Sequence, residues 1–316
     1  MFVDNDAILL ETESYKFLSI VSKLQQIFVQ RKESSKKIDY NDTSCSREAF
    51  LRGSEQQVIS YSLFGELESI ENKARGYFEG IEKNLKLILK LYPGWTVRLY
   101  HEYDIGSSTL AKLCKIACKY SILDLCNVKK VPFFGNIENI TKIMPMNWRF
   151  FPTMDPQVTL LASRDLDSRI CEREVLAVKE WLELSDRAIH VMRDHPCHNV
   201  PMLGGLWDTR LNSKTLREFW KEVWKRILND PLTYSARNKH GNDQVILDKY
   251  VWEPFGRYNS FQHDAYNCEK FKGSIAWPTK RKQGPNNFVA SVYTNNITLQ
   301  ERCPEACRRF REWEYC

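Results

Sequence analysis

The chain has 316 residues, a length that suits one large α/β domain or two small ones, and enough apolar and aromatic residues for a packed core. Its formal charge of +6 is a mild excess without any block of like charge, so we do not expect nucleic-acid binding. No apolar run is long enough for a transmembrane segment, and the N-terminus lacks the basic-then-apolar order of a signal peptide, so we expect a soluble chain or one that has lost an upstream anchor.

Residues 1–56 are expected to form an N-terminal helix and a linker or stem. Apolar residues recur at helical spacing over residues 8–30, and the polar segment RKESSKKIDYNDTS that follows is typical of a linker. Residues 57–316 are expected to form the main domain.

That domain opens with a predicted β-α-β unit. The segment 57–65 (QVISYSLFG) indicates a core strand that ends at Gly65, where backbone can approach a ligand. Helices are predicted at 78–91 and 110–120, and strands at 96–100 and 121–128. This order is typical of a nucleotide-binding half-sheet. Because neither a Gly-x-Gly-x-x-Gly sequence nor a Walker lysine loop is present, dinucleotide cofactors and P-loop chemistry are disfavoured.

The segment 158–169 (VTLLASRDLDSR) is the strongest candidate for a site. An apolar strand delivers Asp165 and Asp167 to a loop at its carboxyl end, the edge at which open α/β sheets bind ligands. Two carboxylates at this spacing can bind one Mg²⁺ or Mn²⁺, which usually also binds a diphosphate. Arg164 is a candidate to add fixed positive charge. The aspartates also suit a turn that leads into a helix.

Arg149 lies inside the aromatic sequence NWRFFP. Stacked on aromatic rings its guanidinium would be well placed near a diphosphate, and it suits equally well a role as a cover over core aromatics. The predicted strand 188–192 ends in the polar sequence RDHPCH, which holds Asp194 and His195. A zinc site in that cluster is disfavoured, because the ligands are crowded and a closed site needs four.

Three more short motifs follow. Gly204 and Gly205 allow backbone close to a substrate. Asp243 and Gln244 lie in the first turn of a predicted helix, where an acidic residue is also simply stabilising. His263 is followed by an aspartate near the end of the domain, and the tail at 305–315 is expected to be an aromatic, basic helix.

Ten cysteines are too few for a disulfide scaffold, and both a few disulfides and free buried thiols are compatible with the sequence. Glycosylation sequons at Asn41, Asn139 and Asn296 support a lumenal setting only weakly, because about two would arise by chance.

Together the motifs resemble metal-dependent glycosyltransferases of the GT-A type, DXD-containing proteins that use nucleotide sugars. The matching segments are YPGW at 92–95, WRF at 148–150, SRDLDSR at 163–169, HVMRDHP at 190–196, GGLW at 204–207, DQ at 243–244 and HD at 263–264. Each is weak alone, and their order and spacing together are specific. The resemblance implies an α/β fold with a GT-A-like, Rossmann-like mixed and mostly parallel sheet flanked by helices, and makes 57–316 the catalytic domain.

By this resemblance, Asp165 and Asp167 would hold Mn²⁺ or Mg²⁺ against the diphosphate of a nucleotide sugar, with His263 as a third ligand. Asp243 and Gln244 would face the transferred sugar. The further residues expected to bind the nucleotide sugar are Ser60, Tyr61, Gly65, Arg149, Arg164, Gly204 and Gly205.

The acceptor would be a hydroxyl group of a glycan, glycoprotein or glycolipid. Asp194, His195 and Asp243 are candidates for the base that takes its proton, and the sequence does not rank them. The resemblance places the protein in the Golgi or ER lumen, whereas the missing anchor leaves a cytoplasmic location open.

Two other functions fit the same motifs. One is a non-catalytic transferase relative that binds nucleotide or glycan. The other is a phosphohydrolase with Asp165 as nucleophile, which is less favoured because such aspartates generally follow the first strand, whereas two or three strands precede Asp165.

Overall fold

The computed structural model describes residues 44–67, 69–134, 140–234 and 240–316. The expected N-terminal helix and the sequons at Asn41 and Asn139 lie outside this part of the chain. Residues 44–56 lie within it and pack on the domain: Cys45 forms a disulfide with Cys126, and the Ser44 hydroxyl donates to Asp155 at 2.8 Å.

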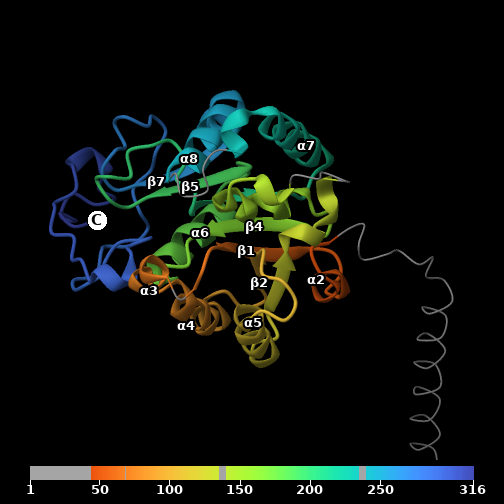
Figure 1. Cartoon of the computed structure of the whole chain (residues 1–316). Coiled ribbons are helices and arrows are strands. Elements are labelled where there is room, and N and C mark those ends of the chain that lie inside the picture. The colour runs from red at the N-terminus through yellow and green to blue at the C-terminus, as the bar shows by residue number, and fades with distance from the viewer. Residues whose placement is uncertain (1–43, 68, 135–139, 235–239) are drawn as a thin grey trace, which may run out of the picture.

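The described residues form a seven-stranded sheet with the strand order β3-β2-β1-β4-β6-β5-β7 (Figure 1). The strands are β1 (Gln56–Leu63), β2 (Thr96–His101), β3 (Leu123–Asn127), β4 (Val158–Arg164), β5 (Ile189–Arg193), β6 (Leu206–Arg210) and β7 (Ser260–Asp264). Strand β6 pairs antiparallel with β4 and β5, and the other pairings are parallel. The expected α/β class with a mixed, mostly parallel sheet is therefore confirmed.

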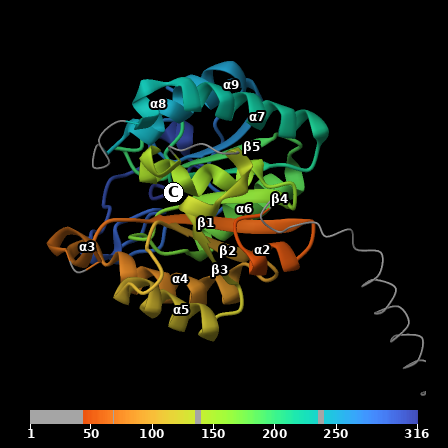
Figure 2. The ribbon, with the colours of Figure 1, turned by 45° about the vertical axis from the view of Figure 1, so that its right-hand side comes forward.

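Helices cover both faces of the sheet (Figure 2). They are α2 (Arg47–Leu51), α3 (Ile70–Arg75), α4 (Tyr77–Leu91), α5 (Ser108–Lys119), α6 (Glu172–Leu184), α7 (Lys214–Asn229), α8 (Asn242–Leu247) and α9 (Arg257–Asn259). A 3₁₀ helix spans Pro145–Met154, and a π-helix spans Asp248–Gly256 between α8 and α9.

Two apolar cores follow from the alternation of side chains along the strands. Ile59 packs with α4, α5 and α6, whereas its neighbour Val58 packs with α7, α8 and the 3₁₀ helix on the opposite face. In α4, the residues Ile81, Leu85 and Ile88 recur at helical spacing and are buried. Because both faces are covered, β1 is buried along most of its length, as expected of a central parallel strand.

Arg164, the last residue of β4, points into the core. Its guanidinium donates to Glu174 of α6 at 2.6 Å and to Asp208 of β6 at 2.7 Å, and all three side chains are buried. Burial alone would lower the pKa of Arg164, but the two carboxylates more than offset this and raise the pKa well above its usual range. The expectation that Arg164 binds the nucleotide sugar is therefore not met, because its hydrogen bonds hold α6 and β6 to β4.

The C-terminal segment after β7 is attached by charge and by disulfides. Asp194, at the end of β5, accepts hydrogen bonds from Arg173 at 2.8 Å, from Arg281 at 3.1 Å and from the Val289 amide at 2.9 Å. Disulfides join Cys268 to Cys307 and Cys303 to Cys316, leaving Cys114, Cys118, Cys171 and Cys197 free. The expected helix in the tail is reduced to one 3₁₀ turn, Glu305–Cys307.

We predict that Arg164→Met lowers the free energy of unfolding by about 3–5 kcal/mol, because it leaves buried carboxylates without their cation. The matched control is Arg226→Met on α7, whose ion pair with Glu222 is exposed and should contribute at most about 0.5 kcal/mol. Urea unfolding followed by tryptophan fluorescence measures both variants. Equal losses in the two would contradict a structural role for the Arg164 cluster.

Candidate functional site

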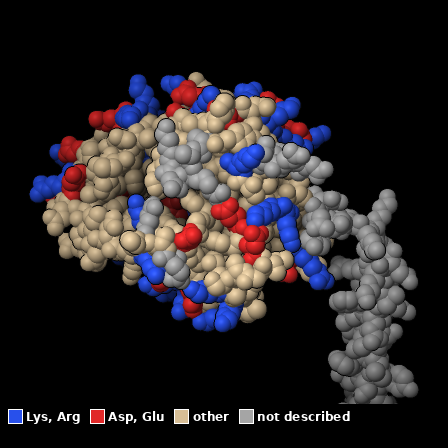
Figure 3. All heavy atoms as spheres, in the orientation of Figure 1, with Lys and Arg blue, Asp and Glu red and all other residues tan. Residues whose placement is uncertain are grey.

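An open cleft of about 550 Å³ lies at the carboxyl ends of β1 and β4. Its walls come from the end of β1, from α3, from the loop after β4, from the start of α8 and from the C-terminal segment near Ala290 and Val292. In the orientation of Figure 1, Figure 3 shows acidic side chains toward the middle of the face, with basic side chains beside them.

Among the described residues, no helix is both long and apolar enough to cross a bilayer.

Asp165 and Asp167 both line the cleft, as predicted. The Asp165 side chain is 38% exposed and that of Asp167 is 11% exposed. Burial, and then the negative charge of Asp165, raises the pKa of Asp167 to about 6, although Arg75 at 3.3 Å lowers it. The two carboxylates are thus close enough to repel each other, and a cation between them would relieve that repulsion.

Arg149 joins the aspartate loop to α8. Its guanidinium forms an ion pair with Asp165 through Nη1 and with Asp243 through Nη2, the latter at 2.7 Å. Its backbone amide donates to the Ser62 hydroxyl at 3.0 Å, which fixes the 3₁₀ helix to β1. Burial alone would lower the pKa of Arg149, whereas Asp165 and Asp243 more than compensate and raise it. The arginine therefore stays charged, and it lines the cleft.

Gly204 and Gly205 lie directly behind these charges. A Cβ atom on Gly205 would overlap the carboxylate of Asp165, and one on Gly204 would overlap Asp243 and Arg149. The carbonyl of Gly204 accepts a hydrogen bond from Ser163 of β4 at 2.7 Å, which holds the pair in place. The sequence predicted that a substrate would approach the backbone of Gly204 and Gly205. In the structure, the side chains of Asp165, Asp243 and Arg149 occupy the space that the missing Cβ atoms leave.

Asp243 and Gln244 lie in the first turn of a helix, α8, as predicted, and both line the cleft. The helix begins after Gly241, whose φ of +88° is in the region that favours glycine. The side chain of Asp243 is buried against Arg149, while Gln244 is part-exposed. The turn thus presents one carboxylate and one amide to the cleft.

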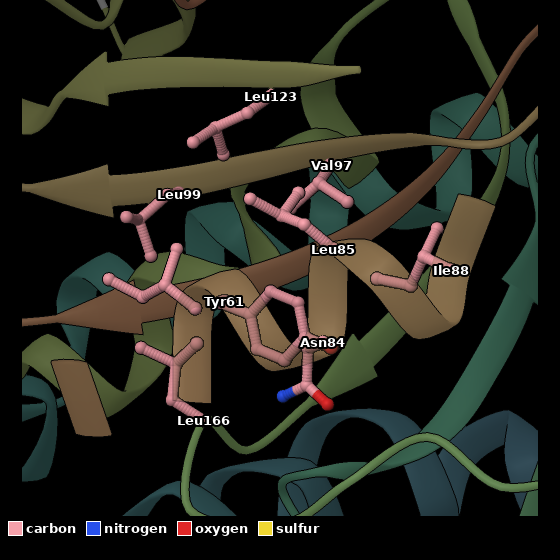
Figure 4. A pocket seen from close by; sticks show the side chains of 9 residues that line it. Tyr61, Asn84, Leu85, Ile88, Val97, Leu99, Leu123 and Leu166 are labelled. Atoms are coloured by element: carbon pink, nitrogen blue, oxygen red, sulfur yellow. The ribbon is translucent and has the colours of Figure 1, made fainter. Parts of the chain in front are cut away.

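The end of β1 meets the expectation for the nucleotide only in part. Gly65 lines the cleft, and its carbonyl accepts from the Tyr103 hydroxyl at 2.9 Å. Ser60 and Tyr61 lie deeper in the sheet, where Figure 4 shows Tyr61 among Leu85, Leu99 and Leu166. Burial raises the pKa of Tyr61, so its hydroxyl stays neutral.

Sequence reasoning missed several lining residues, among them Ser62, Phe64, Asn72 and Arg75. A signal existed for the first two, because they lie in the last part of the strand predicted at 57–65, close to the carboxyl edge where ligands bind. No sequence pattern marked Asn72 or Arg75, which reach the cleft from α3.

Asp194 and His195 are not among the lining residues. Asp194 is buried in the C-terminal attachment, where its arginine partners overcome the effect of burial and lower its pKa. His195 packs against Phe288, with ring centroids 4.6 Å apart, and burial lowers its pKa. The structure therefore does not bring these two candidates for the base to the aspartate pair.

His263 lies far along the sheet from the aspartate pair. Strand β7 is an edge strand separated from β4 by β6 and β5, and both ring nitrogens of His263 are engaged, with His190 at 2.8 Å and Glu180 at 3.0 Å. Its expected role as a third metal ligand is not supported by this position. Within the described part of the chain, no cluster of three or more histidine, cysteine or acidic residues has metal-site geometry.

No family model matches the chain, and no curated protein matches it. Among solved structures it is similar to a glycosyltransferase involved in the glycosylation of the major capsid of PBCV-1, at 15% identity over 66% of this chain and 83% of that one, with a TM-score of 0.33. Mouse xyloside xylosyltransferase 1 aligns at 12% identity over 68% and 86%, with a TM-score of 0.37. A 4-diphosphocytidyl-2C-methyl-D-erythritol synthase from Anaerococcus prevotii aligns at 9% identity over 66% and 87%, with a TM-score of 0.38. Likeness at this level fixes neither substrate nor reaction, which depend on the residues of the cleft.

We predict that the protein becomes less stable as the pH drops from 7 to 5, because His263 is buried in its neutral form. Burial lowers the pKa of His263 to about 4, against the ordinary 6.5 that the unfolded chain has, so the unfolded state binds the proton first as the pH drops. From pH 7 to pH 5 this group should remove about 2 kcal/mol of stability. Urea unfolding at both pH values should show that the loss is smaller by this amount in His263→Gln. An unchanged loss in His263→Gln would contradict the assignment.

Proposed function

We propose that this chain is a metal-dependent glycosyltransferase, which moves a sugar from a nucleotide-diphosphate sugar to a hydroxyl acceptor such as a glycan, glycoprotein or glycolipid. One observation carries the proposal. A single cleft at the carboxyl ends of β1 and β4 joins the Asp165–Asp167 pair to Asp243 and Gln244 through the guanidinium of Arg149.

The cleft suits a nucleotide sugar in size and chemistry. Its volume of about 550 Å³ lies in the range of small-molecule sites. The base and ribose would lie toward Gly65 and Phe64 at the end of β1, and the diphosphate toward Arg149 and the aspartate loop. This orientation places the sugar near Asp243 and Gln244.

The aspartate pair fits a hard divalent cation. Mg²⁺ is commonly bound by one or two carboxylates together with substrate phosphates, and Asp165 and Asp167 supply two carboxylates at the cleft. Burial and then the negative charge of Asp165 raise the pKa of Asp167, and a cation at this position would favour its charged form. When bound, Mn²⁺ or Mg²⁺ would act as a Lewis acid that stabilises charge on the leaving diphosphate.

Asp243 is the candidate base that the cleft favours. Of the three candidates, Asp243 lines the cleft, whereas Asp194 and His195 do not. Its carboxylate would take the proton of the acceptor hydroxyl as the oxygen attacks the sugar, and Gln244 would hold sugar hydroxyls by hydrogen bonds. Arg149 would supply fixed positive charge near the diphosphate.

Three disulfides support an oxidising compartment, since such bonds persist in secreted and lumenal proteins and are rare in the cytosol. We propose the ER or Golgi lumen on this ground. The acceptor would then be a glycan, glycoprotein or glycolipid of the secretory pathway.

The aspartate pair is tested by thermal stability with UDP, GDP and CDP, with and without Mn²⁺. A nucleotide at a hundredfold excess over its dissociation constant should add about 2.7 kcal/mol of stability to the wild type, and only with metal present. The double variant Asp165→Asn/Asp167→Asn should lose both this shift and sugar transfer, whereas the exposed control Asp104→Asn should keep them. No shift in a folded wild type would count against the proposal.

Asp243→Asn separates chemistry from binding. Loss of a general base should lower kcat by about 100-fold or more, while the stabilisation by nucleotide and Mn²⁺ persists. Asp248→Asn, on the adjoining π-helix, should keep wild-type kcat. Metal-dependent nucleotide binding without any transfer in the wild type would instead indicate a non-catalytic nucleotide-binding protein.

A further inference from the structure

We propose that Arg149 is a resident counter-cation that competes with the divalent metal for Asp165 until a nucleotide diphosphate enters the cleft. Metal binding would then depend on nucleotide binding, with Arg149 as the positioning residue that links them. The inference rests on the proposed metal role of Asp165 and Asp167.

The contacts of Asp165 show why the metal and Arg149 compete. One carboxylate oxygen, Oδ1, accepts from Nη1 of Arg149. The other, Oδ2, lies against the backbone of Gly205, where a Cβ atom would not fit. A metal at Asp165 therefore has to share Oδ1 with a guanidinium or replace it, since two cations on one oxygen repel each other.

Arg149 also has an anchor about which it can turn. Nη2 pairs with Asp243 at 2.7 Å, and both of these side chains are buried. Nε of Arg149 is buried and has no hydrogen-bond partner within the described part of the chain. The guanidinium can thus keep Asp243 while Nη1 exchanges Asp165 for an anion, and the unpartnered Nε, which points to the Nη2 side, is a further donor in the cluster.

The charges of the cleft indicate what that anion is. Asp165, Asp167 and Asp243 face the guanidinium groups of Arg149 and Arg75, which leaves these five paired side chains with one net negative charge. Glu66 also lines the cleft, outside this paired cluster. A divalent metal alone would turn the net charge positive with Arg149 still in place. The diphosphate of a nucleotide sugar carries two negative charges, so its arrival with the metal restores the original balance, and its oxygens are good bidentate partners for arginine.

The coupling is reciprocal, because any factor by which nucleotide raises metal affinity is the factor by which metal raises nucleotide affinity.

Arg75 makes a looser contact with Asp167 at 3.3 Å and its side chain is 40% exposed, so it opposes the metal less than Arg149 does.

The test is the Mn²⁺ dissociation constant, measured from the paramagnetic resonance signal of free Mn²⁺ with and without UDP, GDP or CDP. In the wild type, one nucleotide should tighten Mn²⁺ binding by at least about tenfold. In Arg149→Met, nucleotide-free Mn²⁺ binding should tighten by about the same factor, and the further gain from nucleotide should shrink toward onefold. Arg226→Met, which removes one remote positive charge, should behave as the wild type.

A second pair of variants guards against misfolding, since Arg149→Met leaves the buried Asp243 without a partner. Asp243→Asn alone frees both Nη groups for Asp165 and should weaken nucleotide-free Mn²⁺ binding. Arg149→Met/Asp243→Asn removes both charges and should bind Mn²⁺ more tightly than Asp243→Asn does. A merely structural role for Arg149 would not produce these opposite changes.

Failure of this inference and failure of the proposed function give different results. If Asp165→Asn abolishes Mn²⁺ binding while Arg149→Met and its double variant bind no more tightly than their parents, the competition is overturned and the metal site stands. If neither the wild type nor Arg149→Met binds Mn²⁺ with any nucleotide, the metal site fails and the competition fails with it.

Discussion

The position of the cleft depends on the point at which the chain changes direction across the sheet. From β1 the chain adds β2 and then β3 on one side, and returns to place β4 on the other side. The loops after β1 and β4 therefore separate at the carboxyl edge, and open sheets bind ligands at such a switch point. Gly65 and Asp165 follow these two strands, and both line the cleft. The remaining walls are added to this gap from α3, α8 and the C-terminal segment.

Much of the fold could be predicted because its signals are local. The first strand was expected at 57–65 and is found at Gln56–Leu63, and the first long helix was expected at 78–91 and is found at Tyr77–Leu91. Apolar periodicity determines such elements whatever the rest of the chain does. The prediction of a helix at 305–315 is wrong, because this segment forms only one 3₁₀ turn. Two disulfides and the contacts of Asp194 fix its path, and neither can be deduced from spacing.

Residues of the candidate site could be placed from the sequence only where the end of a single strand determines their position. Asp165 and Asp167 end an apolar strand, so their place at the edge follows from the sequence. His263 also ends a strand, but the pairing of β7 beside β5 sets it next to His190 rather than near the aspartates. The order of strands in the sheet decides this, and a single sequence does not reveal that order. Arg164 was misjudged for a similar reason, because strand alternation turns its side chain toward Glu174.

Arg149 and Arg164 each bridge two carboxylates, and the difference between them is access to water. Every member of the Arg164 cluster is buried, so exchanging a partner there would leave a charge in the core, a change that costs several kcal/mol. In the Arg149 cluster, Asp243 is equally buried but Asp165 keeps 38% of its side chain exposed. One half of that bridge is thus buried in the domain, and the other half can be exchanged at little cost. The ion pairs of Arg164 therefore hold the fold together at the end of β4, whereas the ion pair of Arg149 with Asp165 in the cleft is a replaceable contact.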